Sequence, residues 1–314
     1  MSVPLKETVI IGPFLRPYAQ RLAQGFAADD QDMAMHEARL LLNLVLNGPA
    51  PDAAMLYLHD KIEITSTQRA ALDQLITDRL AGKPISRMRG WREFFGYLFY
   101  LNEATLDPRP DSEILIEAAL RATSSSTQAS IEVLDMGTGT GCLLLSFLAE
   151  IKKTGQEIRG VGLDASALAL AQAGDNARHL GLEGVCRFFE SNWDSVLPAD
   201  ASYQIIFCNP PYIATSDAAY LTDEVVKYDP HAALFAGIDG LADWPAVLQA
   251  IARRLDKKGH AFVEIGAGQE RAVKLLAENA GLLLKTYHRD LSGHIRCLEL
   301  MRDDQSLEKK GDGI

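Results

Sequence analysis

The sequence is poor in cysteine and offers no group of metal-binding side chains. Its 314 residues contain four cysteines, none of them in a Cys-x-x-Cys pair. Scattered cysteines in apolar runs are typical of reduced core thiols, so we expect neither a disulfide framework nor a zinc ribbon. His36-Glu37 begins like a zinc-protease helix, but Leu40 stands where the second histidine would be needed. The sequence therefore predicts no metal site.

Long apolar runs are also missing. No stretch of 18 apolar residues occurs, and the first 20 residues contain an acid and prolines where a signal peptide would need an uninterrupted apolar segment. We therefore expect a chain that stays soluble in the cytoplasm and does not bind membranes. A monomer is the starting expectation for its oligomeric state.

Positive charge is scarce. Lys and Arg number 31 against 42 for Asp and Glu, a formal net charge of −11, which repels a phosphate backbone. This balance argues against direct nucleic-acid binding. One stretch departs from it, because no acid separates Lys83, Arg87, Arg89 and Arg92. Such a cluster fits either the solvated face of a hairpin or a contact with a partner.

The hydrophobic content of 47% is enough for about two domains with substantial cores. Helical spacing of apolar residues over 16–80 predicts a small helical domain (1–82), and the aromatic-rich stretch 83–107 predicts a β-hairpin linker. From 108 to 302 strands and helices alternate, which predicts an α/β fold with a Rossmann-like, mostly parallel sheet of seven strands. The charged tail 303–314 is expected to be disordered. Strands are expected at 131–135, 158–164, 185–189, 203–208, 260–264, 282–289 and 295–301, with helices at 141–151, 166–181, 241–255 and 269–280.

A glycine-rich loop follows the first expected strand of this domain. The order D-x-G-x-G-x-G over 135–141 differs from the dinucleotide fingerprint, because Cys142 stands three residues after Gly139. It resembles the loop of S-adenosylmethionine-dependent methyltransferases. In that class the loop receives the methionine part of the cofactor, and an acid at the end of the second strand takes the ribose hydroxyls. Asp164 is that acid by position, and its oxygens are pure acceptors. The remaining alternative is a tight turn without a ligand. The expected cofactor-binding residues here are Asp135, Gly137, Thr138, Gly139, Gly141 and Asp164, and Asn209 further along the chain is expected to join them.

A second motif, Asn209-Pro210-Pro211-Tyr212, ends the apolar strand 203–208. The two prolines cannot continue a ladder of hydrogen bonds, so a stiff turn must stand at the carboxyl end of this strand, where open α/β sheets bind ligands. An amide or exocyclic amine is a poor nucleophile, and both of its N–H groups need acceptors that aim the nitrogen at the methyl group. The side-chain oxygen of Asn209 and the carbonyl of Pro210 can supply them, and Tyr212 can pack on the planar substrate or on the sulfonium.

Together these motifs resemble the release factor glutamine methyltransferases, which methylate the glutamine amide in the Gly-Gly-Gln sequence of class-I peptide chain release factors. The resemblance also includes 90–95 (GWREFF), 108–113 (PRPDSE), 228–230 (YDP) and 233–235 (ALF), and it covers most of the chain. It implies that the 209–212 turn binds the glutamine and that Arg109 belongs to the substrate site. Many family members carry an acid near the end of the third strand that holds the adenosine. Here Asn192 occupies this place, with Trp193 beside it as a candidate to pack on the adenine.

Three other functions remain open. A glutamine methyltransferase acting on a large-subunit ribosomal protein shares both motifs, although that branch carries a Pro-Arg-Ser type sequence where this chain has Pro-Arg-Pro at 108–110. A DNA adenine methyltransferase can use the same turn but would need a basic recognition surface, against the net charge. A non-catalytic binding protein would use the helical domain and the basic linker, but it would not need the intact motifs.

Overall fold

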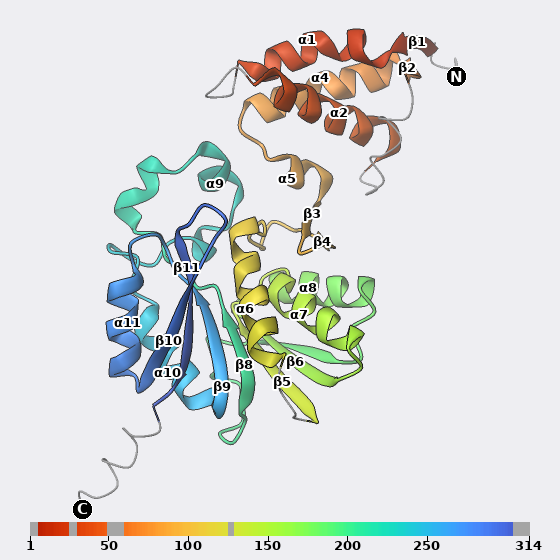
Figure 1. Cartoon of the computed structure of the whole chain (residues 1–314). Helices are drawn as coiled ribbons and strands as arrows, with labels where there is room; N and C mark the ends of the chain where they lie inside the picture. The colour runs from red at the N-terminus through yellow and green to blue at the C-terminus, as the bar shows by residue number, and fades with distance from the viewer. Residues whose placement is uncertain (1–5, 25–29, 49–59, 125–128, 304–314) are drawn as a thin grey trace, which may run out of the picture. The chain divides into compact units, whose positions relative to one another are not determined.

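The computed structural model in Figure 1 describes residues 6–24, 30–48, 60–124 and 129–303. The chain divides into two compact units. The first consists of the residues up to 91 together with 223–228, and the second of 92–222 together with the residues from 229 onward. Almost all of the charged tail lies outside the described residues. In the described residues no helix is both long and apolar enough to cross a membrane.

The first unit is mainly helical. Its helices are α1 (Ile11–Ala23), α2 (Gln31–Asn47), α4 (Ser66–Leu80), α5 (Ile85–Arg89) and the separate helix α9 (Asp223–Tyr228). Helix α4 begins with a capping box in which Thr65 and Gln68 bond reciprocally. Apolar side chains of α1, α2 and α4 form one core cluster. In the near-motif that begins at His36, Glu37 accepts two hydrogen bonds from Arg79, at 2.8 and 3.0 Å, so this acid has a structural role.

Two strands of this unit were not expected from the sequence. β1 (Lys6–Ile10) and β2 (Lys61–Thr65) pair antiparallel in a two-stranded sheet. Only Ile64 of these strands is fully buried, so the ribbon has one weak apolar face and its sequence carries little strand signal.

The stretch expected as a hairpin linker contains both a helix and a hairpin. Helix α5 occupies its start, and β3 (Trp91–Phe94) then pairs with β4 (Tyr97–Tyr100). The two connecting residues, Phe95 and Gly96, have φ values of 51° and 74°, as a two-residue hairpin turn requires. Contacts of the linker cations with neighbouring side chains include those of Arg89, which lies 3.9 Å from the Trp91 ring centroid, and of Arg92, which pairs with Asp107 at 3.0 Å.

The second unit is built on a seven-stranded sheet in the order β10-β11-β9-β8-β5-β6-β7. β5 to β9 are parallel neighbours and β11 is antiparallel to both β9 and β10, which confirms the predicted α/β, Rossmann-like fold. The strands are β5 (Ser130–Met136), β6 (Glu157–Asp164), β7 (Cys186–Glu190), β8 (Tyr203–Cys208), β9 (Leu255–Glu264), β10 (Leu282–Arg289) and β11 (Ile295–Arg302). β9 begins five residues before the predicted start.

Helices pack against this sheet through two separate apolar clusters. They are α6 (Glu113–Thr123), α7 (Cys142–Lys153), α8 (Ala167–His179), α10 (Trp244–Arg254) and α11 (Glu270–Asn279). Val133 of β5 joins the cluster of α6, α7 and α8, whereas its neighbour Leu134 joins the cluster of α10 and α11. Successive side chains of a strand point to opposite faces, so the helices cover both faces of the sheet (Figure 1). The ligand site is then confined to the strand ends.

Candidate active site

A cavity of about 390 Å³ borders one side of the β7–β8 loop, and a larger one of about 490 Å³ lies at the carboxyl ends of the parallel strands. The larger cavity has the size of a small-molecule site. Its walls come from the residues that follow β5, β6, β7 and β8, which is where doubly wound sheets bind ligands. Of the residues predicted from the sequence, it is lined by Arg109, Gly137, Thr138, Gly139, Asp164, Asn192, Trp193, Asn209 and Pro211.

The glycine loop closes onto the end of β6. The backbone N–H groups of Gly137 and Thr138 both donate to the carbonyl of Leu163, each over 2.8 Å. Asp164 accepts from the backbone of Gly139 through Oδ2 and from that of Ser166 through Oδ1, each over 2.9 Å. Each carboxylate oxygen therefore keeps lone pairs for a further donor, which suits the two adjacent hydroxyls of a ribose.

The packing between the glycine loop and β6 allows a ligand to lie close to the backbone of the loop. Gly162 on β6 has no room for a side chain, since a Cβ there would lie 2.6 Å from Phe188 and 3.0 Å from the Thr138 hydroxyl. The Thr138 hydroxyl can therefore pack down against the strand, while Thr138 also lines the cavity. The lining combines carboxylate and amide groups with apolar side chains such as Leu163 and Trp193. These residues fit S-adenosylmethionine, which would bring a transferable methyl group on a sulfonium.

Two predicted cofactor residues lie behind the loop and do not line the cavity. Asp135 is 1% exposed and accepts a hydrogen bond from the Thr138 hydroxyl over 2.6 Å. Burial raises the pKa of Asp135 to about 7, and the bond from Thr138 opposes this rise. Gly141 precedes α7 with a φ of 80°, and a Cβ there would meet Leu145 and Ala173. Both residues shape the loop.

Asn209 stands at the end of β8 with its amide nitrogen turned into the protein. Its Nδ2 donates to Oε2 of Glu264 over 2.9 Å and reaches the Ser112 hydroxyl at 3.4 Å. An ionised carboxylate can only accept, so the nitrogen must face Glu264, and Oδ1 is left as the acceptor for a ligand. Asn209 lines the cavity, and so does Ser112.

Glu264, at the end of β9, is the centre of this network. It accepts from the Ser112 hydroxyl through Oε2 and from the Tyr212 hydroxyl through Oε1, the latter over 3.1 Å. Glu264 is 2% exposed, and burial raises its pKa, although hydrogen bonds from Ser112 and Tyr212 and the nearby Arg296 oppose the rise. The sequence did not single out Glu264. The available signal was an acid ending an apolar strand at the same edge of the sheet as Asn209.

The remaining residues of the 209–212 turn stand around this network. Pro211 lines the cavity, whereas Pro210 and Tyr212 do not. Tyr212 is fixed at both ends: its hydroxyl bonds Glu264, and its carbonyl accepts from Gln269 Nε2 over 2.9 Å. Burial and the charge of Glu264 both raise the pKa of Tyr212, so this tyrosine remains a donor at physiological pH.

The other predicted site residues enter from separate segments. Arg109 lines the cavity and is ion-paired with the buried Asp229, which also accepts from the backbone N–H of Asp107 at 3.3 Å. Asn192 and Trp193 follow β7, and Trp193 has a φ of 52°. This left-handed conformation costs roughly 1–2 kcal/mol in a residue other than glycine, so the surroundings must hold it in place.

Comparison with known proteins places the chain in a class. Residues 127–307 match a family described as "Methyltransferase domain", and residues 19–90 match one described as "PrmC N-terminal domain". The catalytic domain of hMettl16, solved in complex with a MAT2A 3′UTR hairpin, covers 66% of this chain and 75% of its own length with a TM-score of 0.51 and 15% identity, a likeness of fold. The chain is therefore a methyltransferase, and the glycine loop, Asp164 and this family support S-adenosylmethionine as its cofactor.

Curated relatives narrow the class to a family. A release factor glutamine methyltransferase of Rhodospirillum rubrum is 38% identical over 83% of this chain and 77% of its own length. Proteins of the same name from Cereibacter sphaeroides and Agrobacterium fabrum are 37% and 36% identical over 86% and 85% of this chain, and 92% and 90% of their own lengths. The chain belongs to the release factor glutamine methyltransferase family, as the sequence motifs predicted, and it is a protein glutamine methyltransferase.

Proposed function

We propose that this enzyme methylates the side-chain amide nitrogen of the glutamine in the Gly-Gly-Gln sequence of class-I peptide chain release factors, in the cytoplasm. The names of its relatives support this substrate. The observation that carries the chemistry is the orientation of Asn209, whose amide nitrogen is bonded to Glu264 and whose oxygen is thereby offered to the cavity.

The chemistry requires an acceptor at this point. The lone pair of an amide nitrogen is delocalised, so the reaction depends on holding both N–H groups and aiming the nitrogen. Asn209 Oδ1 accepts one N–H. The carbonyl of Pro210, which does not line the cavity itself, accepts the other once the glutamine reaches past Asn209 into the turn. A bound S-adenosylmethionine would supply the methyl group and become a neutral thioether, and the amide nitrogen would release one proton to water as it gains the N–C bond. No covalent enzyme intermediate is needed.

The remaining residues hold the two reactants. Asp164 takes the ribose hydroxyls, and the loop 137–141 receives the methionine part. Asn192 and Trp193 form the adenosine end, while Arg109 and the turn 209–212 form the glutamine side. Asp135 supports the loop from behind, through Thr138.

Labelling with a radioactive methyl donor tests the substrate. The full chain is incubated with a purified class-I release factor and with a lysate of cells that lack the enzyme. We expect label on the release factor, lost when the Gly-Gly-Gln glutamine is replaced by alanine. Label on a large-subunit ribosomal protein, with the release factor untouched, would move the assignment to that substrate.

A substitution tests the role of Asn209 separately. Asn209→Ala should reduce transfer by about a hundredfold or more, since an acceptor made for the reacting group is lost. Calorimetry should show that donor binding survives. Asn279→Ala, at the exposed end of α11, is the matched control and should transfer normally.

A further inference from the structure

Asn192 and Trp193 form a wall between two cavities. Both residues line the cofactor cavity, and both also line the second cavity of about 390 Å³. The second cavity is completed by Asp194, Ser195 and four residues of α10, namely Ala246, Gln249, Arg253 and Arg254. The wall has open space against both cavities, and Trp193 packs in addition against the apolar cluster of α10 and α11. The backbone of the β7–β8 loop and this packing together fix the position of the wall.

That backbone has an unfavourable conformation at the wall. Trp193 and Phe95 are the two non-glycine residues with a positive φ in the described part of the chain. Phe95 stands in a hairpin turn, where this conformation is usual. Trp193 stands in a turn that the Ser195 N–H closes on the Asn192 carbonyl over 3.3 Å, but glycine, asparagine or aspartate is the usual residue at such a position. A large aromatic residue remains in the left-handed region only when its surroundings fix it there.

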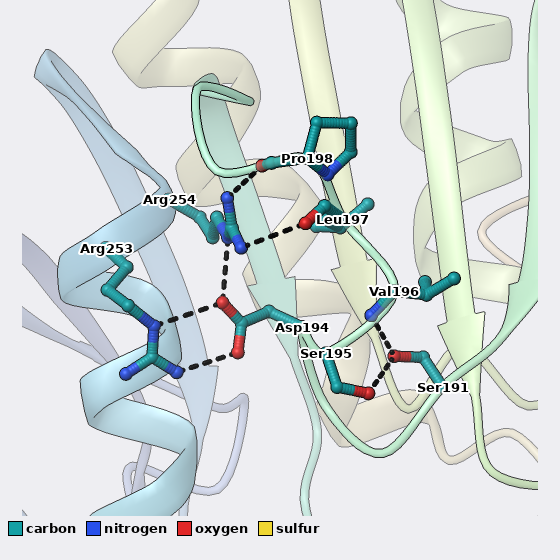
Figure 2. Close-up of polar contacts among 8 residues, drawn as sticks. All are labelled: Ser191, Asp194, Ser195, Val196, Leu197, Pro198, Arg253 and Arg254. Carbon is teal, nitrogen blue, oxygen red and sulfur yellow. Dashed lines mark hydrogen bonds and ion pairs between the residues drawn. The ribbon is translucent and has the colours of Figure 1, made fainter.

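The next residue, Asp194, supplies a fixed point (Figure 2). Its carboxylate accepts from Arg253 Nε at 3.2 Å and Nη2 at 2.7 Å, and from Arg254 Nε at 2.7 Å. Asp194 is 5% exposed and Arg254 is 7% exposed. Although burial opposes it, the hydrogen bonds and charges of the two arginines hold the pKa of Asp194 below its usual value. The carboxylate therefore stays ionised and bonded.

Arg254 extends this attachment along the loop. Its guanidinium also donates to the carbonyls of Leu197, at 3.3 Å, and of Pro198 (Figure 2). At the other end, the Ser191 hydroxyl lies 3.2 Å from that of Ser195. The Ser191 backbone N–H donates to the carbonyl of Asp164 over 2.9 Å. The segment 191–198 is thus tied to α10 on one side and to the residue predicted to bind ribose on the other.

We propose that Asp194, gripped by Arg253 and Arg254, is a positioning residue for S-adenosylmethionine. It holds segment 191–198 so that Trp193 keeps its left-handed backbone and presents its indole, together with Asn192, to the adenosine end of the cofactor cavity. Asp194 acts through Trp193 and does not touch the cofactor, since it lines only the second cavity.

Donor affinity of the full chain tests this proposal. Asp194→Asn keeps the size of the side chain but loses its charge, and calorimetry should show S-adenosylmethionine and S-adenosylhomocysteine bound about tenfold more weakly. Arg253→Gln is a milder variant, because the Arg253 side chain is 54% exposed and Arg254 still bonds Asp194. It should weaken donor binding about threefold, and it tests the proposal if Asp194→Asn does not fold. Arg178→Gln, which breaks an exposed ion pair with Asp175 on α8, is the control and should bind normally.

A double-mutant cycle separates positioning from general stabilisation. Trp193→Gly removes the indole and relaxes the backbone, because glycine adopts a positive φ freely. If Asp194 acts through Trp193, then Trp193→Gly with Asp194→Asn should bind the donor as weakly as Trp193→Gly alone. Additive losses would overturn the proposal. So would variants that melt at lower temperature but bind both ligands as tightly as the unchanged protein.

Discussion

Asn209 and Glu264 face each other across the ends of two neighbouring parallel strands, with Asn209 Nδ2 donating to Glu264 Oε2 over 2.9 Å. The pairing follows from the register of the two strands. Cys208, the last residue of β8, lies opposite Val263 of β9, so the next residues along the chain, Asn209 and Glu264, meet at the strand ends. The sheet thus fixes which end of the Asn209 amide is offered to the cavity. The predictions below test this arrangement and its neighbours.

Glu264→Gln should lower kcat by about tenfold, because a hydrogen bond to a charged group is worth about 1.5–3 kcal/mol. It should also change the pH profile. Burial raises the pKa of Glu264 above its usual value, so in the unchanged enzyme activity is lost as the pH falls through that raised pKa and the carboxylate takes up a proton. The variant has no such group and should lose this acidic limb.

The measurement is kcat against pH, with Glu132→Gln as the control. Glu132 lies near the start of β5, the opposite end from the cavity. If Glu264→Gln kept an acidic limb with the same midpoint, the loss of activity at low pH would belong to another titrating group.

Donor binding should depend on pH through Asp135. Its pKa of about 7 means that the carboxyl group is part protonated at neutral pH. S-Adenosylmethionine would bring a cationic sulfonium to the glycine loop and favour the ionised form, so it should bind more tightly as the pH rises from 6 to 8. S-Adenosylhomocysteine has the same other charges but no sulfonium and should show a smaller change. Calorimetry of both ligands checks this, and Asp135→Asn should remove the difference between them.

Asp164→Ala should weaken donor binding by roughly 10- to 100-fold, since two charge-assisted hydrogen bonds to ribose are lost. The Gly139 and Ser166 backbone groups that it holds also lose their acceptor. Adenosine and methylthioadenosine, which keep the ribose, should be weakened as much as the full donor. Unchanged calorimetric affinity would remove Asp164 from the ribose role.

Gly162→Ala should destabilise the second unit by about 1–3 kcal/mol, as overpacking does in a close-packed interior. The new methyl would lie 2.6 Å from Phe188 and 3.0 Å from the Thr138 hydroxyl, so the glycine loop must move as well. We therefore expect both a lower melting temperature and weaker donor binding. Gly184→Ala is the control, because nothing lies within 4 Å of its Cβ position.

The sequence predicted most of the second unit because its signals are local. β8 was placed at 203–208 from its apolar run and the prolines after it, and Ser166 does cap α8 by accepting from Ala169. The glycine loop and Asp164 needed only the rule that parallel strands end at one edge. The strands β1 and β2 were missed because a two-stranded ribbon with one buried residue has little periodic pattern.

Contacts between segments that are distant in the sequence could not be predicted from such local patterns. Glu264 meets Asn209 only because β9 lies beside β8, and the two residues are 55 apart in sequence. Asp194 meets Arg254 across 60 residues, and neither belongs to a motif. Strand order and helix placement, which no local pattern encodes, bring these pairs together.

Helix α9 has a consequence for synthesis on the ribosome. It belongs to the first unit, where Glu224 pairs with Arg79 although the two residues are 145 positions apart in the sequence. During synthesis, α1 to α5 are therefore made well before α9, and the unit stays incomplete until β5 to β8 have also been made. Expression of residues 1–91 alone should give a fragment that is more readily digested by proteases than the same residues in the full chain.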